Sequence, residues 1–512
     1  MKLMSHIPTP NLPVLLSRRY FLGGAAALSA STLLSGCAAS LMTPAVGTTF
    51  PKLVANPQPV PSGPISSAAV TISTATSGSI DAGFAGLSYE KSSLCEPLFS
   101  VSNSDLLGLF QRLGSSVLRI GGNTVDQSVW TPNGQGGTAG QIAPADVASL
   151  AAFVKAAGWQ CIYGINLGGA ATGATTPALA AAEVAYAAEQ FGSSLIGIEI
   201  GNECDGYGAA GSYFAGAWSL STFQALWSQF RSAILAQTPG VPITGPASGS
   251  NVSTWTVPFG KAVTRNGISL LSQHYYRGDG HASTATGAML VAPDPKLVNC
   301  LSLLSTGAQS IGIPFRLSEC NSFFGGGAPG VSDSPASALW ALDFLFSCAQ
   351  GGASGVNFHG GGLSSYSPIA NQSGSVLGVR PEYYGILFFT LAGQGTLCQT
   401  EVSAGGLNVT AYTVKDPAGR MSLVVVNKEA TQNLQLAINL PQAANAASLV
   451  ALTQPSGGAT ESLAGTSAMT IQNGSVASNG NFSPSAAHNL ATSGSQVTCY
   501  VPAFSAVLIQ IG

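Results

Sequence analysis

Residues 195–203 read Leu195-Ile196-Gly197-Ile198-Glu199-Ile200-Gly201-Asn202-Glu203, a short apolar run that ends in an amide and a carboxylate. The run Phe315-Arg316-Leu317-Ser318-Glu319 has the same form and also ends in a glutamate. In a parallel β/α barrel, functional side chains lie at the carboxyl ends of the strands. Charged residues make up only 8% of the chain. Two glutamates at such positions therefore indicate a functional site.

Around these two runs, short apolar stretches alternate with alanine- and leucine-rich stretches of helical character. Eight candidate strands span residues 83–89, 117–120, 161–166, 195–200, 241–245, 269–275, 314–318 and 353–358. The expected helices span residues 105–113, 144–157, 176–191, 220–237, 295–307, 334–349 and 381–392. Strict alternation predicts a parallel sheet covered by helices. Eight such units predict an α/β fold, a (β/α)8 TIM barrel over residues 80–393. An open doubly wound sheet is the alternative, but polar residues that recur at the strand ends favour the barrel.

The helical pattern ends near residue 393. Apolar runs at residues 407–414, 421–426, 434–438, 447–452, 497–501 and 506–511 are separated by Gly, Asn and Ser. This texture predicts an all-β sandwich over residues 394–512. The run Ala68-Ala69-Val70-Thr71-Ile72-Ser73 precedes the barrel, and we expect a strand at residues 65–79 to pair into that sheet.

The N-terminal residues 1–37 carry an export signal. Ser17-Arg18-Arg19-Tyr20-Phe21-Leu22 is a twin-arginine pattern, and a short apolar stretch follows it. Leu33-Leu34-Ser35-Gly36-Cys37 resembles a lipobox, in which the cysteine is acylated; a plain signal peptide is the alternative. Residues 38–64 are rich in Pro and Ser and form a tether. The sequence predicts an exported protein, periplasmic or on the outer cell surface, whose membrane contact is a lipid on Cys37.

Composition argues against several classes of function. The formal charge is −3 and Lys and Arg do not cluster, so nucleic acid is not an expected partner. Walker, H-E-x-x-H and C-x-x-C motifs are absent, so we expect no metal and no cofactor. Gly206-Tyr207-Gly208-Ala209-Ala210-Gly211 matches G-x-G-x-x-G but lacks the acidic residue about twenty positions later, so we interpret it as a loop over the cleft. The spacing of the nine cysteines leaves disulfide pairing open.

Two opposed carboxyl groups suit the cleavage of a glycosidic bond. The reaction needs an acid for the leaving oxygen and a second carboxylate at the anomeric carbon. If the two lie about 5 Å apart, the second can bond to the sugar and configuration is retained. The fourth and seventh strands of a barrel face each other, so Glu203 and Glu319 can flank one sugar. For either glutamate alone, a structural ion pair is the alternative.

Asn202-Glu203 after the fourth strand, with Glu319 at the seventh, is the signature of clan A glycoside hydrolases. Further similarity is carried by Ser318-Glu319-Cys320-Asn321-Ser322-Phe323-Phe324-Gly325-Gly326-Gly327-Ala328-Pro329, Trp340-Ala341-Leu342-Asp343, Leu118-Arg119-Ile120-Gly121-Gly122-Asn123 and Gln273-His274-Tyr275-Tyr276. These segments resemble glycoside hydrolase family 79, the β-glucuronidase and heparanase family. The resemblance in architecture runs from about residue 70 to the C-terminus.

The resemblance implies roles for the residues around the two glutamates. Glu203 would be the general acid/base and Glu319 the nucleophile. Asn202 would hold the sugar 2-hydroxyl, and Tyr275 would hydrogen-bond Glu319. Arg119 is placed to keep Glu319 ionised, with a buried structural ion pair as the other interpretation.

The resemblance also implies residues that bind the sugar. Gly326, through its backbone N–H, and Tyr366 match positions that recognise a uronic-acid carboxylate. Glu90 and Asn123 match hydroxyl-binding positions.

Three residues at the barrel mouth have two interpretations, and one position departs from the family. His274, Tyr276 and His359 either contact the substrate or pack at the barrel end. Phe324 stands where relatives often carry a tyrosine, and a phenyl ring cannot donate a hydrogen bond to a carboxylate. A 4-O-methylated glucuronate or a neutral sugar is therefore an alternative to glucuronate.

Taken together, these features predict a retaining glycoside hydrolase. The expected enzyme is exo-acting and β-glucuronidase-like, and it cleaves a terminal uronic acid by double displacement. The expected partner is a carbohydrate, and the lack of basic clusters argues against a polysulfated chain. Another clan A specificity, or a non-catalytic carbohydrate-binding lipoprotein on the same scaffold, is the alternative.

Overall fold

The computed structural model describes residues 56–455 and 469–512. The expected export signal at residues 1–37, with the lipid-bearing Cys37, lies outside these ranges, as does the tether up to residue 55. Within the described ranges, no helix combines the length and apolar character needed to cross a bilayer. The eight cysteines of these ranges are free thiols. No disulfide therefore crosslinks the described part of the chain.

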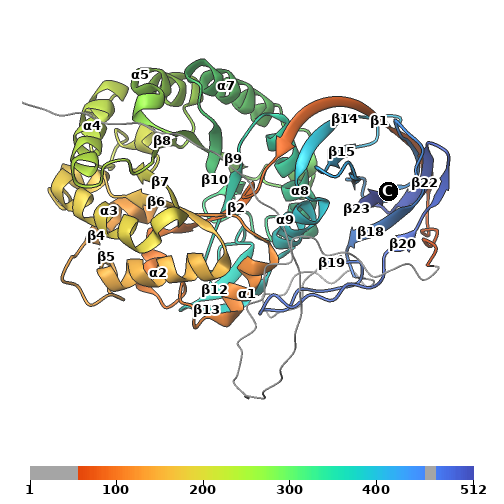
Figure 1. The fold of residues 1–512 in the computed structure, drawn as a ribbon, viewed down its shortest axis with the longest axis horizontal. Coiled ribbons are helices and arrows are strands. Elements are labelled where there is room, and N and C mark those ends of the chain that lie inside the picture. Colours follow the sequence, from red (N-terminus) through yellow and green to blue (C-terminus); the bar gives the residue numbers. More distant parts are fainter. Residues whose placement is uncertain (1–55, 456–468) are drawn as a thin grey trace, which may run out of the picture. The chain divides into compact units, whose positions relative to one another are not determined.

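Eight parallel strands close into a barrel with helices around it (Figure 1). The strands of the ring are β2 Ala85–Glu90, β3 Val117–Gly121, β6 Gln160–Ile165, β7 Leu195–Ile200, β8 Ile243–Ser248, β9 Leu270–Asp279, β10 Phe315–Phe324 and β11 Val356–Gly360. The predicted (β/α)8 barrel is confirmed, since β10 pairs with β11 and β9 and the ring is closed. β9 and β10 extend beyond their apolar runs because they stay paired as far as Asp279 and Phe324, so Glu319 lies inside β10.

Local capping rules explain where the helices begin and end. The helices are α1 Ser104–Arg112, α2 Pro144–Ala157, α3 Pro177–Phe191, α4 Leu220–Gln237, α5 Val257–Gly267, α6 Gly287–Val291, α7 Pro295–Ile311, α8 Pro335–Gln350 and α9 Pro381–Ala392. Five of them begin with proline, whose missing N–H needs no partner in the first turn. The Thr176 and Asp294 side chains accept backbone N–H bonds at the starts of α3 and α7. Gly158 and Gly312, with φ of 71° and 69°, end α2 and α7.

Short helical turns and two small sheets complete the loops of the barrel. The turns are η1 Lys91–Cys95, η2 Asn123–Gln127, η3 Gly168–Ala171, η4 Gly192–Ser194, η5 Cys204–Gly206 and the π-helical η6 Val252–Thr256. The small sheets pair β4 Val129–Trp130 with β5 Gln141–Ile142, and β12 Ile369–Gln372 with β13 Ser375–Val379.

Buried Arg316 fills the amino-terminal end of the barrel. Its Nε donates to Asn357 Oδ1 (2.6 Å) and its Nη2 donates to the carbonyl oxygen of Gly83 (3.0 Å). Glycine is required next to it, because a Cβ on Gly355 would overlap the guanidinium. This end of the barrel is packed, and the polar side chains of the strand ends gather at the opposite end.

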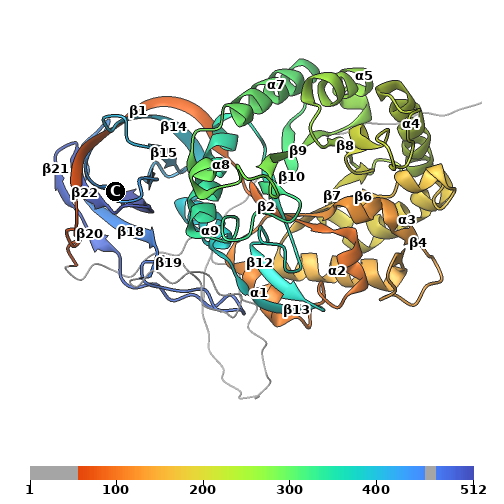
Figure 2. The same cartoon turned by 180° about the vertical axis from the view of Figure 1, so that it is seen from behind.

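An eleven-stranded sheet forms the second part of the fold (Figure 2). Its strands are β1 Ile65–Ile80, β14 Gly395–Ser403, β15 Val409–Lys415, β16 Met421–Asn427, β17 Asn433–Asn439, β18 Ala447–Thr453, β19 Thr470–Ile471, β20 His488–Asn489, β21 Ala491–Ser493, β22 Gln496–Val501 and β23 Ser505–Ile511. β1 lies between β14 and β17, antiparallel to the first and parallel to the second. The strands form one continuous hydrogen-bonded sheet that curls around its own core (Figures 1 and 2).

Both faces of this sheet are buried at its centre. Along β16, Leu423 and Val425 belong to the core inside the curl, whereas Val424 and Val426 belong to the core shared with the barrel. Successive side chains of a strand point to opposite faces, so a strand buried on both sides reads as a continuous apolar run. This explains the uninterrupted apolar run that the sequence has at residues 421–426.

Candidate active site

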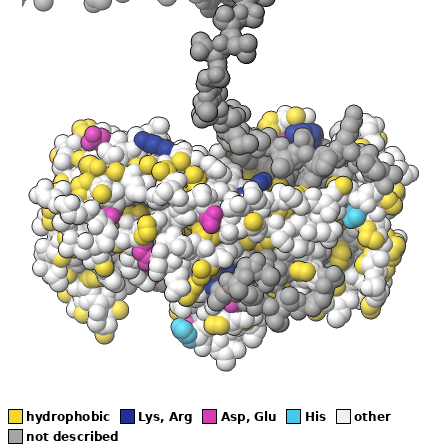
Figure 3. Space-filling view, turned by 90° about the horizontal axis from the view of Figure 1, so that it is seen from below, with side chains coloured by type: hydrophobic (Ala, Val, Ile, Leu, Met, Phe, Trp, Pro, Cys, Tyr) yellow, Lys and Arg dark blue, Asp and Glu magenta, His cyan; other side chains and the backbone are white. Residues whose placement is uncertain are grey.

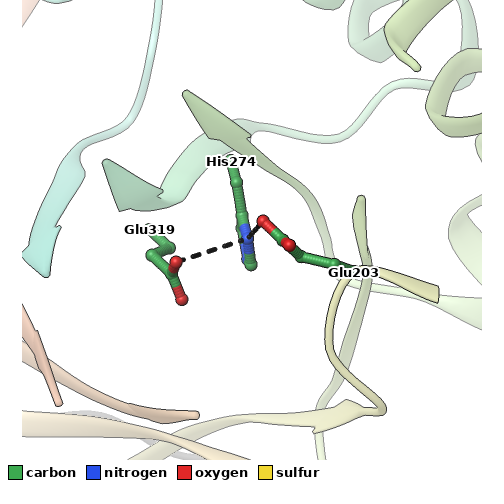
Figure 4. A group of neighbouring side chains, drawn as sticks. All are labelled: Glu203, His274 and Glu319. Carbon is green, nitrogen blue, oxygen red and sulfur yellow. Dashed lines mark hydrogen bonds and ion pairs between the residues drawn. The ribbon is translucent and has the colours of Figure 1, made fainter. Parts of the chain in front are cut away.

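Glu203 and Glu319 meet at the carboxyl end of the barrel. Three atoms lie within 4.8 Å of one another: a carboxylate oxygen of Glu203, a carboxylate oxygen of Glu319 and a ring nitrogen of His274. The His274 ring lies between the two carboxylates (Figure 4), with Nδ1 3.0 Å from Glu203 Oε1 and 3.8 Å from Glu319 Oε1. The barrel therefore brings both predicted catalytic carboxylates to one gap.

The backbone that carries Glu203 has an uncommon conformation. Glu203 has a φ of 48°, in the left-handed region that non-glycine residues rarely occupy. Its N–H donates to the carbonyl oxygen of Ala247 (2.8 Å), and the N–H of Asn202 donates to the Tyr207 hydroxyl (3.2 Å). The neighbouring strand and loop thus fix a conformation of the kind that clusters at functional sites. The resulting Glu203 side chain is 37% exposed, while that of Glu319 is 7% exposed.

Glu319 is surrounded by positive charge and hydrogen-bond donors. Arg119 Nη1 donates to its Oε2 (2.5 Å) and the Tyr276 hydroxyl donates to its Oε1 (2.8 Å). Burial alone would raise the pKa of the Glu319 carboxyl. The charges of His359, His274 and the guanidinium, with the tyrosine hydrogen bond, outweigh burial and hold this pKa well below its usual value. Glu319 is therefore ionised at neutral pH, as a nucleophile requires.

Arg119 links three polar side chains below the gap. Besides Glu319, its Nε donates to Glu199 Oε2 (2.7 Å) and its Nη2 donates to Asn202 Oδ1 (2.8 Å). Ser318 completes the cluster, because its hydroxyl donates to Glu199 Oε1 (3.1 Å). Arg119 is thus both a buried ion-pair partner and the contact of Glu319. Asn202 is held with its Nδ2 directed toward Asn123 Oδ1, 3.5 Å away.

The assignment of Tyr275 as the partner of Glu319 was wrong, because Tyr276 makes that contact. The Tyr275 hydroxyl donates instead to Asp294 Oδ2 (2.6 Å), at the start of α7. Neighbouring side chains of a strand point to opposite sides, so His274 and Tyr276 face the gap while Tyr275 faces the helices. The predicted substrate contact of Tyr275 fails for the same reason.

Glu90 accepts hydrogen bonds from the neighbouring turn η2. Its carboxylate accepts bonds from the N–H groups of Asn123 (3.1 Å) and Thr124 (2.8 Å) and from the Thr124 hydroxyl (2.6 Å). Burial would raise the pKa of Glu90, but the hydrogen bond and charge of His359 and the bonds from Thr124 lower it overall. A Cβ on Gly122 would overlap this carboxylate, which explains the glycine. The predicted hydroxyl-binding role of Glu90 remains a prediction.

A glycine loop and aromatic side chains border the gap on the side of Glu319. Gly326 accepts a bond from the N–H of Tyr366 (3.4 Å), so the two predicted carboxylate-binding residues are neighbours. The ring centroids of Tyr366 and Tyr276 lie 6.2 Å apart. Phe324 packs edge-on against Tyr276 and is 49% exposed. Its phenyl ring therefore lies at the rim beside Tyr276, the hydrogen-bond donor to Glu319.

Three further residues belong to the site: His359, for which the sequence leaves substrate contact and packing open, and Asp126 and Tyr207, to which the sequence assigns no role. His359 lies 3.7 Å from Glu319 through Nδ1 and 3.5 Å from Glu90 through Nε2. Burial lowers the pKa of His359, but the charge of Glu319 and the interaction with Glu90 raise it overall. Asp126 accepts a short bond from the Tyr207 hydroxyl, which in turn holds Asn202. The sequence could have assigned His359 to the site, because it follows an apolar strand. It could not have paired Asp126 with Tyr207, because these two residues become neighbours only through the fold.

Among the residues that the structure describes, Glu203, His274 and Glu319 form the group whose donor atoms are close enough together to bind a metal ion. Arg119 already supplies a positive charge to Glu319 at 2.5 Å.

Lys and Arg are few and scattered on the face drawn in Figure 3. The charged side chains that this view shows form no basic surface of the kind that binds phosphates.

Comparison with known proteins supports the resemblance to glycoside hydrolase family 79. No family model matches the chain. A β-glucuronidase of Aspergillus niger is 28% identical over 307 residues, covering 52% of this chain and 55% of the relative. The chain thus spans about half the length of the curated relative it matches.

Solved structures agree on the fold. A 4-O-α-L-rhamnosyl-β-D-glucuronidase from Fusarium oxysporum superposes with a TM-score of 0.70 at 18% identity, over 89% of this chain and 100% of that one. An α-L-arabinofuranosidase from Thermotoga maritima gives a TM-score of 0.64 at 15% identity, over 87% and 99% of the chains. These similarities establish the architecture alone.

Proposed function

We propose that this protein is a retaining glycoside hydrolase that releases a terminal β-linked uronic acid, acting at chain ends. The observation that carries the proposal is the spacing of the two carboxyl groups, whose facing oxygens lie within 4.8 Å. Retaining enzymes hold the pair about 5–5.5 Å apart, whereas inverting enzymes need about 6.5–9.5 Å to admit a water molecule. The separation favours direct attack by a carboxylate.

In the first step, a Glu319 oxygen bonds to the anomeric carbon as the bond from that carbon to the leaving oxygen breaks. Glu203 gives its proton to the leaving oxygen, so the departing group is a neutral alcohol. In the second step, Glu203 takes a proton from water, and the water oxygen displaces Glu319 from the sugar. Both carboxyl groups return to their starting states. The ionised, enclosed Glu319 and the more exposed Glu203 suit these two roles.

The uronic-acid preference rests on the similarity to a β-glucuronidase and on the loop beside Glu319. Gly326 and Tyr366 would bind the sugar carboxylate, and Asn202 would hold the 2-hydroxyl. Phe324 gives this rim a more apolar character than a tyrosine would. That observation favours a 4-O-methylated glucuronide as the second candidate substrate.

A non-catalytic sugar-binding protein is a poorer fit. Two carboxylates that face each other across a gap repel, and a binding protein has no use for that cost. Arg119 and two histidines are arranged to keep one of the two ionised, which has a purpose in catalysis.

A chromogenic substrate panel with detection of the product anomer by proton NMR tests the proposal. We expect hydrolysis of an aryl β-glucuronide or its 4-O-methyl form, little hydrolysis of an aryl β-glucoside, and the β-anomer as first product. Glu319→Gln should lower kcat at least about 1,000-fold. The matched control is Glu401→Gln, which changes an exposed glutamate on β14. The proposal would be overturned if the α-anomer formed first, or if no substrate of the panel were hydrolysed.

Glu203→Ala distinguishes the acid/base from the nucleophile. The variant should keep much of its activity toward dinitrophenyl glycosides, because a good leaving group needs little protonation. It should lose activity toward alkyl glycosides, and azide should restore turnover as a glycosyl azide.

We further propose, from the sequence pattern, that the protein is exported and anchored by a lipid on Cys37. Cys37→Ser should move the protein from the membrane fraction to the supernatant of lysed cells and abolish its labelling by radioactive palmitate.

A further inference from the structure

A second open space adjoins the acid/base residue and is not used by the reaction steps described above. It is a cavity of about 260 Å³ bordered by Asn123, Asn202 and Glu203. The rest of its wall comes from two loops and is made of Asp205, Gly206, Ser212, Tyr213, Ser250 and Asn251, among others. Glu319 and Tyr276 are not part of its wall, and neither are Gly326 and Tyr366, the two residues expected to bind the sugar carboxylate. The cavity therefore extends from Glu203 away from the nucleophile.

The wall after β8 is fixed by one carboxylate. Asp205 accepts bonds from the N–H groups of Gly249 (2.8 Å), Ser250 (3.1 Å) and Asn251 (3.2 Å). It also accepts a bond from Asn251 Nδ2 (2.9 Å). A turn held by four bonds presents its serine and asparagine to the cavity in one arrangement.

The opposite wall presents an aromatic ring. Tyr213 is half-buried and packs edge-on against Tyr207, with ring centroids 4.9 Å apart at 67°. Tyr207 is itself buried and bonded to Asp126. Packing of Phe214 on Trp218 (4.4 Å, 13°) and the bond from Trp218 Nε1 to the Cys204 carbonyl (2.6 Å) hold the same loop. Tyr213 is therefore a supported ring at the edge of the cavity.

The chemistry of the wall restricts what the cavity can bind. Its ionisable groups with formal charge are the carboxyls of Asp126, Glu203 and Asp205, and no Lys, Arg or His is among its lining residues. An anionic group would be repelled there. Hydroxyl and amide side chains match the hydroxyl groups of a sugar, and an aromatic ring packs against the apolar face of a sugar ring. The volume is below the about 300 Å³ at which pockets for drug-sized molecules begin, so it suits one ring.

We propose that this cavity binds the leaving group, and that the residue joined to the uronic acid is an uncharged sugar. This inference rests on the proposed function, since the group that Glu203 protonates must lie on the Glu203 side of the broken bond. Tyr213 packs against that sugar, and Ser250 and Asn251 contact its hydroxyls. Substrates with a sulfated or acidic sugar at this position are poor ones.

Two substrates with the same glucuronic acid separate the inference from the proposed function. Glucuronosyl β-fluoride has a leaving group that does not reach the cavity, and glucuronosyl-β-1,3-galactose fills it. We expect wild type to cleave both, and Tyr213→Ala to lower the ratio of kcat/KM for the disaccharide to that for the fluoride about tenfold. Tyr213→Phe, which keeps the ring, should hold the ratio within about twofold of wild type.

The outcomes are distinct. No fluoride release by wild type refutes the proposed function and the inference with it. Cleavage of the fluoride but not of the disaccharide, or an unchanged ratio in Tyr213→Ala, refutes the inference alone.

A charge placed in the cavity provides an independent test. Ser250 lines the cavity and is exposed, whereas Ser253 is exposed three residues later and does not line it. With the galactose disaccharide and its 6-sulfated form, Ser250→Lys should raise the preference for the sulfated substrate about fivefold. Ser253→Lys should leave that preference as in wild type. Equal effects of the two lysines, or a wild-type preference for the sulfated sugar, would contradict an uncharged leaving sugar.

Discussion

Arg119 holds three side chains around the gap, because its guanidinium donates hydrogen bonds to Glu319, Glu199 and Asn202 at once. Lysine offers a single charged point and no planar fork, so it cannot reach all three partners. With Arg119→Lys we expect kcat to fall about 100-fold, as for the loss of one positioned donor.

The pH profile of Arg119→Lys gives a second readout. The guanidinium helps hold the pKa of Glu319 below its usual value, so its loss raises that pKa. The acidic limb of kcat/KM should then move to higher pH. Arg112→Lys, far from the gap and bonded to the Gly480 carbonyl, is the matched control. An unmoved acidic limb would mean that the arginine has a structural role only.

Tyr275 and Tyr276 form a natural matched pair of neighbouring tyrosines on one strand. Tyr276→Phe removes the donor to Glu319 Oε1, and we expect kcat to fall about 10- to 100-fold. Tyr275→Phe removes only the bond to Asp294 outside the barrel, so kcat should stay within about threefold and Tm should fall slightly. Steady-state kinetics and calorimetry on both variants check this, and a reversed order of the two kinetic effects would refute the assignment.

At the scale of the element, apolar runs and helix-capping residues are the sequence features that predict most of the strands and helices. They predict the barrel because each strand is buried on both sides and each helix start follows local rules. The same patterns could have separated Tyr276 from Tyr275, since strand alternation pairs Tyr276 with His274. They could not predict that Glu90 would bind the turn at Thr124, because that contact depends on how two loops meet in space.

The α9 helix carries a buried acid below the loop of Tyr366. Burial raises the pKa of Glu382 well above its usual value, and the bond from Asn321 and the charge of Arg380 offset this only in part. The folded protein thus prefers the protonated form, while the unfolded chain ionises near a pH of about 4.3. The stabilising contribution is complete below that pH and is lost as the pH rises through the folded-state pKa.

Glu382→Gln keeps the neutral form at every pH. Its Tm should equal that of wild type near pH 4 and exceed it by about 2 °C or more at pH 8. Calorimetry at the two pH values checks this, with Glu401→Gln as the exposed control on β14. A Tm gap that does not grow with pH would show that Glu382 is not held neutral.

At the scale of the molecule, one carboxylate joins the barrel to the curled sheet. Asp343 of α8 accepts bonds from the Thr410 hydroxyl (2.5 Å), the Tyr412 hydroxyl (2.6 Å) and Lys428 Nζ (2.8 Å), all from the sheet. Phe346, one turn later, stacks on Tyr412 with centroids 4.6 Å apart and planes 7° apart. The order of residues gives no hint of this junction, because its partners lie more than sixty positions away.

Asp343→Ala would leave the ammonium group of Lys428, which is 3% exposed, without its negatively charged partner. Removing one member of a buried pair costs about 3–5 kcal/mol, because a charge then stays buried and unpaired. The exposed pair of Asp416 and Arg420 has a similar distance, 2.7 Å, so Asp416→Ala is the matched control, with an expected change within about 1 kcal/mol. Urea titrations that give the free energy of unfolding measure both changes.

α8 follows directly after β10, which carries Glu319, so activity should disappear at the same urea concentration as the fold in Asp343→Ala. Loss of activity well before unfolding would instead mean that the junction acts on the site without holding the fold together.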